Sequence, residues 1–375
     1  MKIKAAVLRE IGRKGPYAQT RPLEITELEL DPPGRGELLL GMRAVGLCHS
    51  DLSVIDGNRP RPVPMVLGHE AAGEVLQVGE GVTQFALGDH VVTTFVPTCG
   101  HCSPCMHGRP GLCEPGFMAN SAGTLLSGAR RLHDTGSVVN HMIGVAGFAD
   151  HAVVAQESCV RIDRELPFDE AALFGCAIIS GVGAVVNTAQ VTPGSTVAVV
   201  GLGGVGLAAI MGAKRAGAAS LLAVDLSEAK LELAGELGAT EGFNAGESDV
   251  VDRIRAATFG GVDYAFEMAG SAKALELAWR ITRRGGMTVT AGLPHADARL
   301  SISPTQLTAE ERTLKGSYLG SCIPARDIPR YIEWYRRGEL PVQRLLSERL
   351  ALEDINAGFD RLASGAGVRQ VIVFG

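Results

Sequence analysis

The sequence has few aromatic side chains, no excess of positive charge and no long uninterrupted apolar segment. Phe, Trp and Tyr make up 5 % of the 375 residues, too few for a surface that stacks on single-stranded nucleic acid. The net charge of −6 argues against a basic surface for nucleic acid or anionic membranes. No apolar window has the length of a transmembrane helix, and Arg9 and Glu10 interrupt the first apolar run, so no secretory signal is predicted. We therefore expect a cytoplasmic protein that binds neither nucleic acid nor membrane.

Glycine and cysteine are abundant by contrast. The 48 glycines indicate many tight turns and close backbone approaches. In a reducing compartment, clustered cysteines favour metal binding over disulfides. The eight cysteines are Cys48, Cys99, Cys102, Cys105, Cys113, Cys159, Cys176 and Cys322.

Two patterns of secondary structure divide the chain. Up to about residue 177, short apolar or alternating runs are punctuated by Pro and Gly, which predicts an irregular, mostly β domain. Residues 178–319 alternate apolar strands with amphipathic helices, which predicts an α/β domain with a doubly wound parallel sheet. We expect this nucleotide domain to be inserted into a second domain built from residues 1–177 and 320–375.

A glycine-rich turn follows the first predicted strand of the nucleotide domain and opens a helix. Its G-x-G-x-x-G pattern is typical of a loop that approaches a pyrophosphate at a helix N-terminus. The loop comprises Gly201, Gly203, Gly204, Val205 and Gly206. Asp225 ends the next strand, where a carboxylate accepts hydrogen bonds from a ribose, and this argues against a plain strand–helix turn without a ligand. Because Leu226 and Ser227 follow rather than an arginine, we predict NAD over NADP.

Four cysteines lie within fifteen residues, with the spacing C-x2-C-x2-C-x7-C. Four thiolates complete a tetrahedral zinc shell and leave no position for a substrate. An iron–sulfur cluster is an alternative, although ferredoxin runs continue with a shorter gap, and disulfides or free thiols are another. The candidate zinc ligands are Cys99, Cys102, Cys105 and Cys113.

Further candidate ligands are scattered along the chain. Two cysteines and one histidine would leave the fourth zinc position open, which is the catalytic arrangement. Spacing alone does not show that Cys48, His69 and Cys176 converge, since a lone cysteine is commonly a small buried hydrophobe. Cys159 and Cys322 receive no role.

Taken together, "GLCHSD", "GHEAAGEV", "CGHCSPC", "GCAIISG" and "GLGGVG" resemble the motifs of the zinc-dependent medium-chain alcohol dehydrogenases, almost from end to end. The likeness is strongest to the liver-type and glutathione-dependent formaldehyde-oxidising branch. It implies a GroES-like catalytic domain, a Rossmann NAD domain, two zinc ions per chain and a homodimer. An inactive NAD(H)-sensing or structural relative, and a zinc-free quinone reductase, are the competing interpretations.

The resemblance assigns roles around the catalytic zinc. Cys48, His69 and Cys176 would be its ligands, and the four clustered cysteines would hold the structural zinc. Glu70 would be the nearby carboxylate that exchanges with a ligand. Asp51 would fix the ring of His69.

The same resemblance assigns the proton path and the cofactor contacts. Ser50 would be the first hydroxyl of the proton relay. His49 and Arg369 would contact the NAD pyrophosphate, and Asp225 and Lys230 the ribose. The implied reaction is the reversible oxidation of a primary or secondary alcohol to an aldehyde or ketone.

Three positions depart from the family pattern. Ser53 replaces the histidine that ends the relay in liver-type enzymes, and Phe117 and Arg59 replace an arginine and an acidic residue of the glutathione-dependent enzymes. Positions that face substrate in relatives are all apolar, which favours a bulky aliphatic or aromatic alcohol over a thiol adduct or a polyol. These positions are Phe95, Met118, Met142 and Leu293.

Overall fold

The computed structural model describes residues 1–375 and divides them into two compact units. The first unit, which we call the catalytic unit, combines Met1–Cys176, Ile323–Pro329 and Gln343–Gly375. The second, the nucleotide unit, combines Ala177–Cys322 and Arg330–Val342. An insertion of one unit into the other is therefore present, as the change of pattern near residue 177 predicts.

The C-terminal division differs from the predicted one, which placed everything after residue 319 with the catalytic domain. Residues 330–342 belong to the nucleotide unit. Within that unit, Asn187 donates a hydrogen bond to the hydroxyl of Tyr331 at 3.2 Å, and the guanidinium of Arg215 lies 4.8 Å from the ring centre of Trp334. Tyr331 and Trp334 are three residues apart, which is a helical spacing, but spacing alone does not show which unit a helix packs against.

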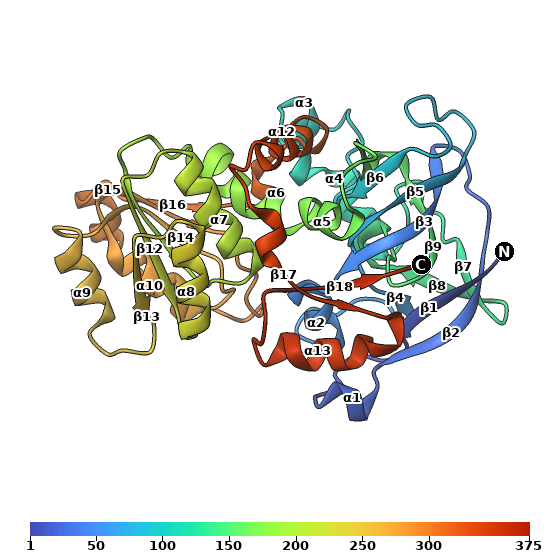
Figure 1. Ribbon diagram of the computed structural model, residues 1–375, viewed down its shortest axis with the longest axis horizontal. Helices are drawn as coiled ribbons and strands as arrows, with labels where there is room; N and C mark the ends of the chain where they lie inside the picture. Colours follow the sequence, from blue (N-terminus) through green and yellow to red (C-terminus); the bar gives the residue numbers. More distant parts are fainter. The chain divides into compact units, whose positions relative to one another are not determined.

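Two β structures form the catalytic unit. The first is a closed barrel of β1 (Lys2–Leu8), β2 (Leu23–Leu30), β7 (Leu132–Asp134), β8 (Ser137–His141) and β4 (Met65–Val66). The second is a seven-stranded sheet of β10 (Cys159–Ile162), β6 (His90–Thr93), β5 (Glu70–Val78), β3 (Glu37–Gly46), β18 (Arg369–Val373), β17 (Leu346–Leu350) and β9 (His151–Ala155), the last paired with β3. β18, from the C-terminal end of the chain, pairs with β3 and so joins the two chain ends in one sheet (Figure 1).

Short helices connect these strands. The α-helices are α1 (Tyr17–Thr20), α2 (His49–Ile55), α3 (Ser103–Met106), α4 (Glu114–Ala122), α5 (Phe168–Ala172) and α13 (Ile355–Ala363). The short 3₁₀ segments are η1 (Pro110–Leu112), η2 (Met142–Gly144), η3 (Gln156–Ser158), η4 (Leu173–Gly175) and η8 (Leu352–Asp354). Two further helices, α12 (Pro324–Arg336) and η7 (Val342–Leu345), include residues of both units.

A six-stranded parallel sheet forms the nucleotide unit, as the strand–helix alternation predicts. Its order is β13 (Glu241–Asn244), β12 (Ser220–Asp225), β11 (Thr196–Val200), β14 (Val262–Glu267), β15 (Thr282–Thr290) and β16 (Thr313–Gly316). Its helices are α6 (Ala177–Gly183), the π-helix η5 (Ala184–Ala189), α7 (Gly204–Arg215), α8 (Glu228–Leu237), α9 (Val250–Ala257), α10 (Ala272–Ile281), α11 (Pro304–Ala309) and the short turn η6 (Leu319–Ser321).

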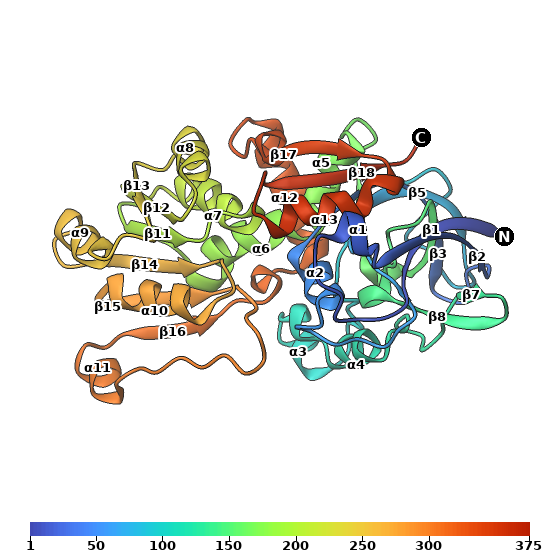
Figure 2. The same cartoon turned by 90° about the horizontal axis from the view of Figure 1, so that it is seen from below.

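The strand order places β11 and β12 side by side in parallel, with α7 and α8 packed against them (Figure 1). α11 lies on a long excursion between β15 and β16 (Figure 2). Apolar side chains of β11, β12 and β14 pack with those of α9 and α10 in one buried core. The carboxyl ends of parallel strands are where such sheets bind ligands, so the glycine-rich loop after β11 lies at the expected edge.

No single helix has the length and apolar composition needed to cross a membrane. One bent pair, Phe168–Gly175 with Ala177–Ala189, meets the criterion by length and composition alone.

Candidate active site

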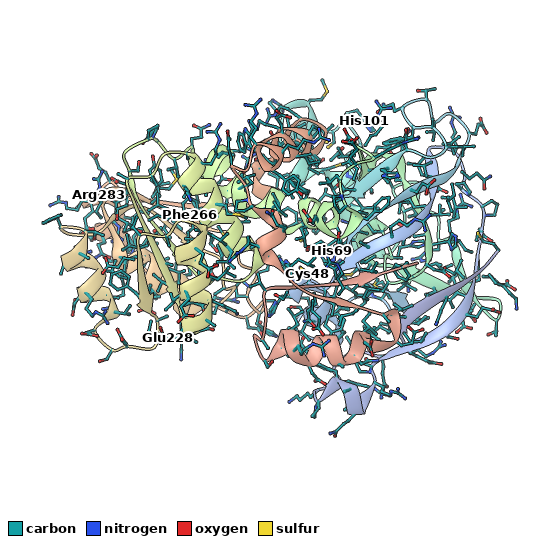
Figure 3. The ribbon with its side chains drawn as sticks, in the orientation of Figure 1. Cys48, His69, His101, Glu228, Phe266 and Arg283 are labelled. Carbon is teal, nitrogen blue, oxygen red and sulfur yellow. The ribbon has the colours of Figure 1, made fainter.

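Three residues from distant parts of the sequence converge inside the catalytic unit. Cys48 precedes α2, His69 precedes β5, and Cys176 follows η4. Their ligand atoms lie within 4.8 Å of one another, and all three residues are buried. Figure 3 labels Cys48 and His69 among the side chains of this unit. The Cys48 and Cys176 sulfurs are 4.0 Å apart, and His69 Nε2 lies 3.5 Å from the Cys176 sulfur.

These distances fit a zinc ion. With zinc–sulfur bonds of about 2.3 Å and a zinc–nitrogen bond of about 2.1 Å, tetrahedral coordination separates two sulfurs by about 3.8 Å and a sulfur from a nitrogen by about 3.6 Å. The soft thiolates and the imidazole are also ligands that zinc prefers. The three side chains supply three ligands and leave a fourth position for another molecule.

Asp51 orients the histidine of this cluster. Its Oδ1 accepts a hydrogen bond from the Gly68 backbone N–H at 3.0 Å and lies 3.3 Å from His69 Nδ1, so that Nε2 faces the sulfurs. Both side chains are fully buried. Burial disfavours a charged imidazole, but the Asp51 carboxylate and the Cys48 thiolate together raise the pKa of His69 above its ordinary value.

The two cysteines of the cluster differ in their ionisation. A hydrogen bond from the Cys176 thiol lowers the pKa of Cys48 well below its ordinary value. The same contact, together with burial, raises the pKa of Cys176. Without a metal, Cys48 therefore gives up its proton more readily than Cys176, and a bound cation would displace protons from ligands whose pKa is raised.

A buried ion pair lies beside the cluster. Arg369 Nε is 3.5 Å from Glu70 Oε1, and both side chains are almost entirely buried. Burial raises the pKa of Glu70 to about 7, although the arginine opposes the shift. Neither carboxylate oxygen of Glu70 has a hydrogen-bond partner. Arg369 thus faces Glu70 in this structure, and its contact with a pyrophosphate stays a prediction.

The residues of the implied proton path lie on α2. His49 is exposed, and Ser50 is partly buried in the first turn of the helix. The Ser53 hydroxyl donates a hydrogen bond to the His49 carbonyl at 2.8 Å, within its own helix. The Ser53 hydroxyl is therefore hydrogen-bonded within its own helix, and unlike an imidazole it cannot hold the proton near neutral pH.

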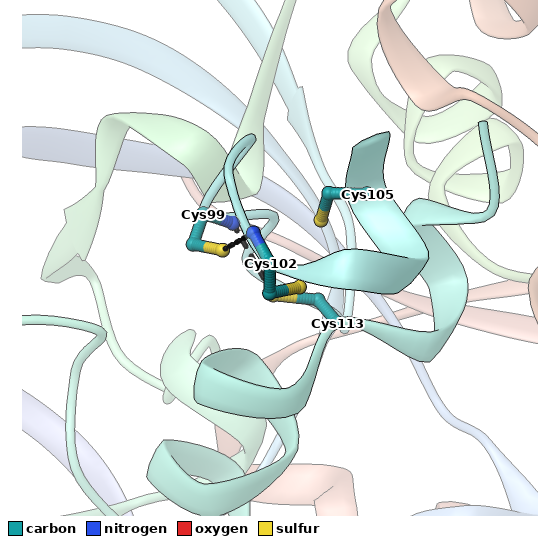
Figure 4. A group of neighbouring side chains, drawn as sticks. All are labelled: Cys99, Cys102, Cys105 and Cys113. Atoms are coloured by element: carbon teal, nitrogen blue, oxygen red, sulfur yellow. Dashed lines mark hydrogen bonds between the residues drawn. The ribbon is translucent and has the colours of Figure 1, made fainter. Parts of the chain in front are cut away.

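The four clustered cysteines form a second group in the catalytic unit, around α3 and η1 (Figure 4). Their sulfurs also lie within 4.8 Å of one another, and those of Cys102 and Cys113 are 3.9 Å apart, which fits a shared zinc and is far too long for a disulfide. The backbone N–H groups of Cys99 and Gly116 both point at the Cys113 sulfur, at 3.3 and 3.4 Å. Four ligands close the shell.

Hydrogen bonds and burial give these four thiols unequal acidity. A hydrogen bond from the backbone N–H of Cys105 lowers the pKa of the half-buried Cys102 thiol to about 6. Burial raises the pKa of Cys105 to about 12. Backbone N–H groups aimed at sulfur stabilise thiolates, which are the form that binds zinc.

The glycine-rich loop of the nucleotide unit has the geometry that its motif predicts. Gly201 has φ +92°, and a Cβ on Gly206 would lie 1.8 Å from the Gly201 carbonyl oxygen. Asp225 closes the loop from the end of β12: its carboxylate accepts hydrogen bonds from the backbone N–H groups of Leu202 at 2.6 Å and Ser227 at 3.0 Å. Lys230 lies partly buried on α8.

Only part of the predicted substrate wall is brought together by the catalytic unit. The Phe95 ring meets the His69 ring edge-on, with centres 5.9 Å apart, and Met142 is buried in η2. Met118 lies on α4 with 66 % of its surface exposed, and Leu293 belongs to the nucleotide unit. The pairing of Arg369 with Glu70 had no signal in the sequence, because residues 299 positions apart show no local pattern.

Comparisons with known proteins agree with this arrangement. Residues 34–164 match the alcohol dehydrogenase GroES-like domain, and residues 204–337 match the zinc-binding dehydrogenase domain. The S-(hydroxymethyl)glutathione dehydrogenase of Synechocystis sp. is 36 % identical over 99 % of this chain and 100 % of its own.

Two solved structures are similar over their whole length. An alcohol dehydrogenase zinc-binding domain protein from Burkholderia ambifaria has a TM-score of 0.94 and 34 % identity, covering 100 % of this chain and 99 % of that one. The benzyl alcohol dehydrogenase of Acinetobacter calcoaceticus has a TM-score of 0.93 and 32 % identity, covering 100 % of both chains. The chain therefore belongs to the zinc-dependent alcohol dehydrogenases of the medium-chain dehydrogenase/reductase superfamily.

Proposed function

We propose that this protein oxidises a bulky aliphatic or aromatic alcohol to its aldehyde or ketone, reversibly and with NAD. The observation that carries the proposal is the buried cluster of Cys48, His69 and Cys176, which offers three zinc ligands and an open fourth position. A zinc ion held there lowers the pKa of an alcohol hydroxyl, and NAD supplies the hydride acceptor.

The chain's own groups orient the ligands and move the proton. Asp51 holds the His69 ring with Nδ1 toward its carboxylate and Nε2 toward the sulfurs, so that Nε2 is directed at the metal position. Ser50, two residues after Cys48, takes the alcohol proton and passes it outward. With Ser53 bonded to its own helix, the proton leaves from Ser50 to water. If the relay ends in water, the pH dependence of the oxidation rate should not show the pKa of a relay histidine.

The four-cysteine group is proposed to hold a second, structural zinc ion, giving two per chain. Metal analysis of the purified protein tests the count, and two zinc ions per chain are expected. A count of zero would overturn both assignments, and iron with the absorption of a cluster would overturn the structural one.

The preference for NAD rests on Asp225. Its carboxylate stands at the end of β12 with the exposed Leu226 beside it and no adjacent arginine, so a 2′-phosphate would meet a negative charge. Comparing kcat/KM for NAD and NADP tests the preference, and equal values would contradict it.

The substrate class is tested with a panel of alcohols. The apolar ring of Phe95 beside His69 favours benzyl alcohol over sorbitol. A second candidate is the hydroxymethyl adduct of glutathione, since the Synechocystis relative is named for it. Phe117 and Arg59, which replace an arginine and an acidic residue of that branch, argue against the adduct. Efficient turnover of the adduct with poor turnover of benzyl alcohol would select the second candidate. The homodimeric state stays a prediction.

A further inference from the structure

We propose that Asn120 is a positioning residue that holds Phe95 against His69 and thereby fixes the wall of the alcohol pocket. The proposal rests on the function proposed above. None of the motifs includes Asn120, and no role follows for it from the family resemblance.

The contacts of Asn120 reach Phe95 directly. Asn120 lies on α4 and is 5 % exposed, and its Nδ2 donates a hydrogen bond to the Phe95 carbonyl at 2.7 Å. Arg61 Nη1 donates a hydrogen bond to the backbone carbonyl of Asn120 at 3.1 Å. The ring of Phe95 in turn stands edge-on to His69, with an angle of 84° between the two planes. One buried amide therefore links α4 to the residue that packs on a proposed zinc ligand.

The other side of the Asn120 amide faces η2. Its Oδ1 is buried without a hydrogen-bond partner, and a Cβ built on Gly144 would lie 3.6 Å from it. The Ser158 hydroxyl is also buried and unpartnered, 3.8 Å from the same point. Of the polar atoms of the Asn120 amide group, Oδ1 therefore has no partner, and Nδ2 is held by the Phe95 carbonyl.

The backbone of η2 is strained next to this contact. Ile143 has φ +40°, and Ala146, which follows η2, has φ +58°. Such backbone persists only where its surroundings hold it, and it is concentrated at functional sites. η2 carries Met142, α4 carries Met118, and Phe95 follows β6, so Asn120 stands where three segments with predicted pocket residues meet.

Two variants test the amide group, one that keeps the size of the side chain and one that removes most of it. Asn120→Asp removes the Nδ2 donor and sets a carboxylate against the Phe95 carbonyl, whereas Asn120→Ala removes the whole link. We expect each to raise the KM for benzyl alcohol by about tenfold, since small displacements of a binding wall have effects of this order. The KM for ethanol, which is too small to reach the ring, and kcat for both alcohols should change less than about threefold.

Asn140→Ala is the matched control. Asn140 is a second buried asparagine of the catalytic unit, and its Nδ2 donates to the Pro64 carbonyl at 2.8 Å rather than to Phe95. A merely structural role for Asn120 predicts that both variants lower stability while neither separates benzyl alcohol from ethanol. That result would overturn the proposal.

A double-mutant cycle with Phe95→Ala decides whether Asn120 acts through Phe95. If it does, the effect of Asn120→Asp on the KM for benzyl alcohol disappears once the ring is absent. An effect that persists in full would overturn the proposal.

A crystal structure of Asn120→Asp gives a readout that does not depend on turnover. We expect the Phe95 ring to leave its edge-on contact with His69, and an unchanged ring would overturn the proposal. If the unmodified protein oxidises neither alcohol, the proposed function fails while this structural test still decides the role of Asn120 toward Phe95.

Discussion

The two cysteine-containing groups of the catalytic unit differ in how the chain builds them. The four-cysteine group comes from residues 99–113, and three of its members are only half-buried. The other group draws Cys48, His69 and Cys176 from separate stretches and buries all of them. The dense group looks more reactive in the sequence, yet its four sulfurs would complete a metal shell. The dispersed group leaves a position open.

The difference shows what each region contributes. A closed shell needs only a short loop, because neighbouring residues can reach one ion, and it stabilises the segment that carries them. In an open shell, three ligands must keep their positions without a fourth protein ligand, which requires rigid neighbouring structure. Here that structure consists of Asp51, the buried strands and the Glu70–Arg369 pair.

The largest effect is expected from the dispersed group. Cys48→Ala should lower kcat/KM by about 10³-fold or more, because the substrate alcohol loses the zinc ion that would lower its pKa. Metal analysis should then find one zinc ion per chain instead of two. The control is Cys159→Ala, a buried cysteine of the same unit outside both groups, which should keep two zinc ions and its activity. Retained activity in Cys48→Ala would remove the assignment of the open site.

The orientation of His69 should have a smaller effect. Asp51→Asn keeps the size of the side chain but removes its charge, so we expect zinc affinity at the open site to fall by about 10- to 100-fold. Competition with a chelator measures it. Zinc bound as tightly as in the unmodified protein would show that the 3.3 Å contact between Asp51 and His69 does not support the ligand.

Acidification should also weaken the open site. The pKa values of His69 and Cys176 are both raised, so each group keeps its proton to a higher pH than usual, and zinc must displace that proton to bind. Affinity should therefore fall as the pH falls, by about tenfold per pH unit for each displaced proton. Zinc binding followed from pH 8 to 6 checks this, in a Cys105→Ser background so that only the open site is titrated. A flat profile would contradict the predicted protonation.

The smallest effect on catalysis is expected from the closed group. Cys105→Ser should remove one zinc ion and lower the melting temperature, because the loop loses a metal ligand. The chemistry lies elsewhere, so kcat/KM below the melting transition should stay within about threefold of the unmodified protein, by the additivity of distant sites. Loss of activity with the fold intact would break the contrast between the two groups.

Short-range sequence patterns were enough to predict much of the fold. The strand–turn–helix at Gly201, with Asp225 at the next strand end, was predictable because its glycines are required by backbone geometry within a few residues. The four-cysteine group was predictable for the same reason, since its ligands are neighbours in the chain. Residues 330–342, by contrast, pack through Tyr331 and Trp334, whose helical spacing does not show which unit they join.

The sequence by itself determined the parallel nucleotide-binding sheet, the glycine-rich loop, the closed cysteine group and, through resemblance, the candidate ligands. Only the tertiary structure decided that Cys48, His69 and Cys176 meet, that Arg369 pairs with Glu70, and that Asn120 donates a hydrogen bond to the Phe95 carbonyl. The physical reason is the range of the contacts. Short-range geometry is set by spacing along the chain, whereas these contacts join residues that only the packing of separate strands and helices brings together.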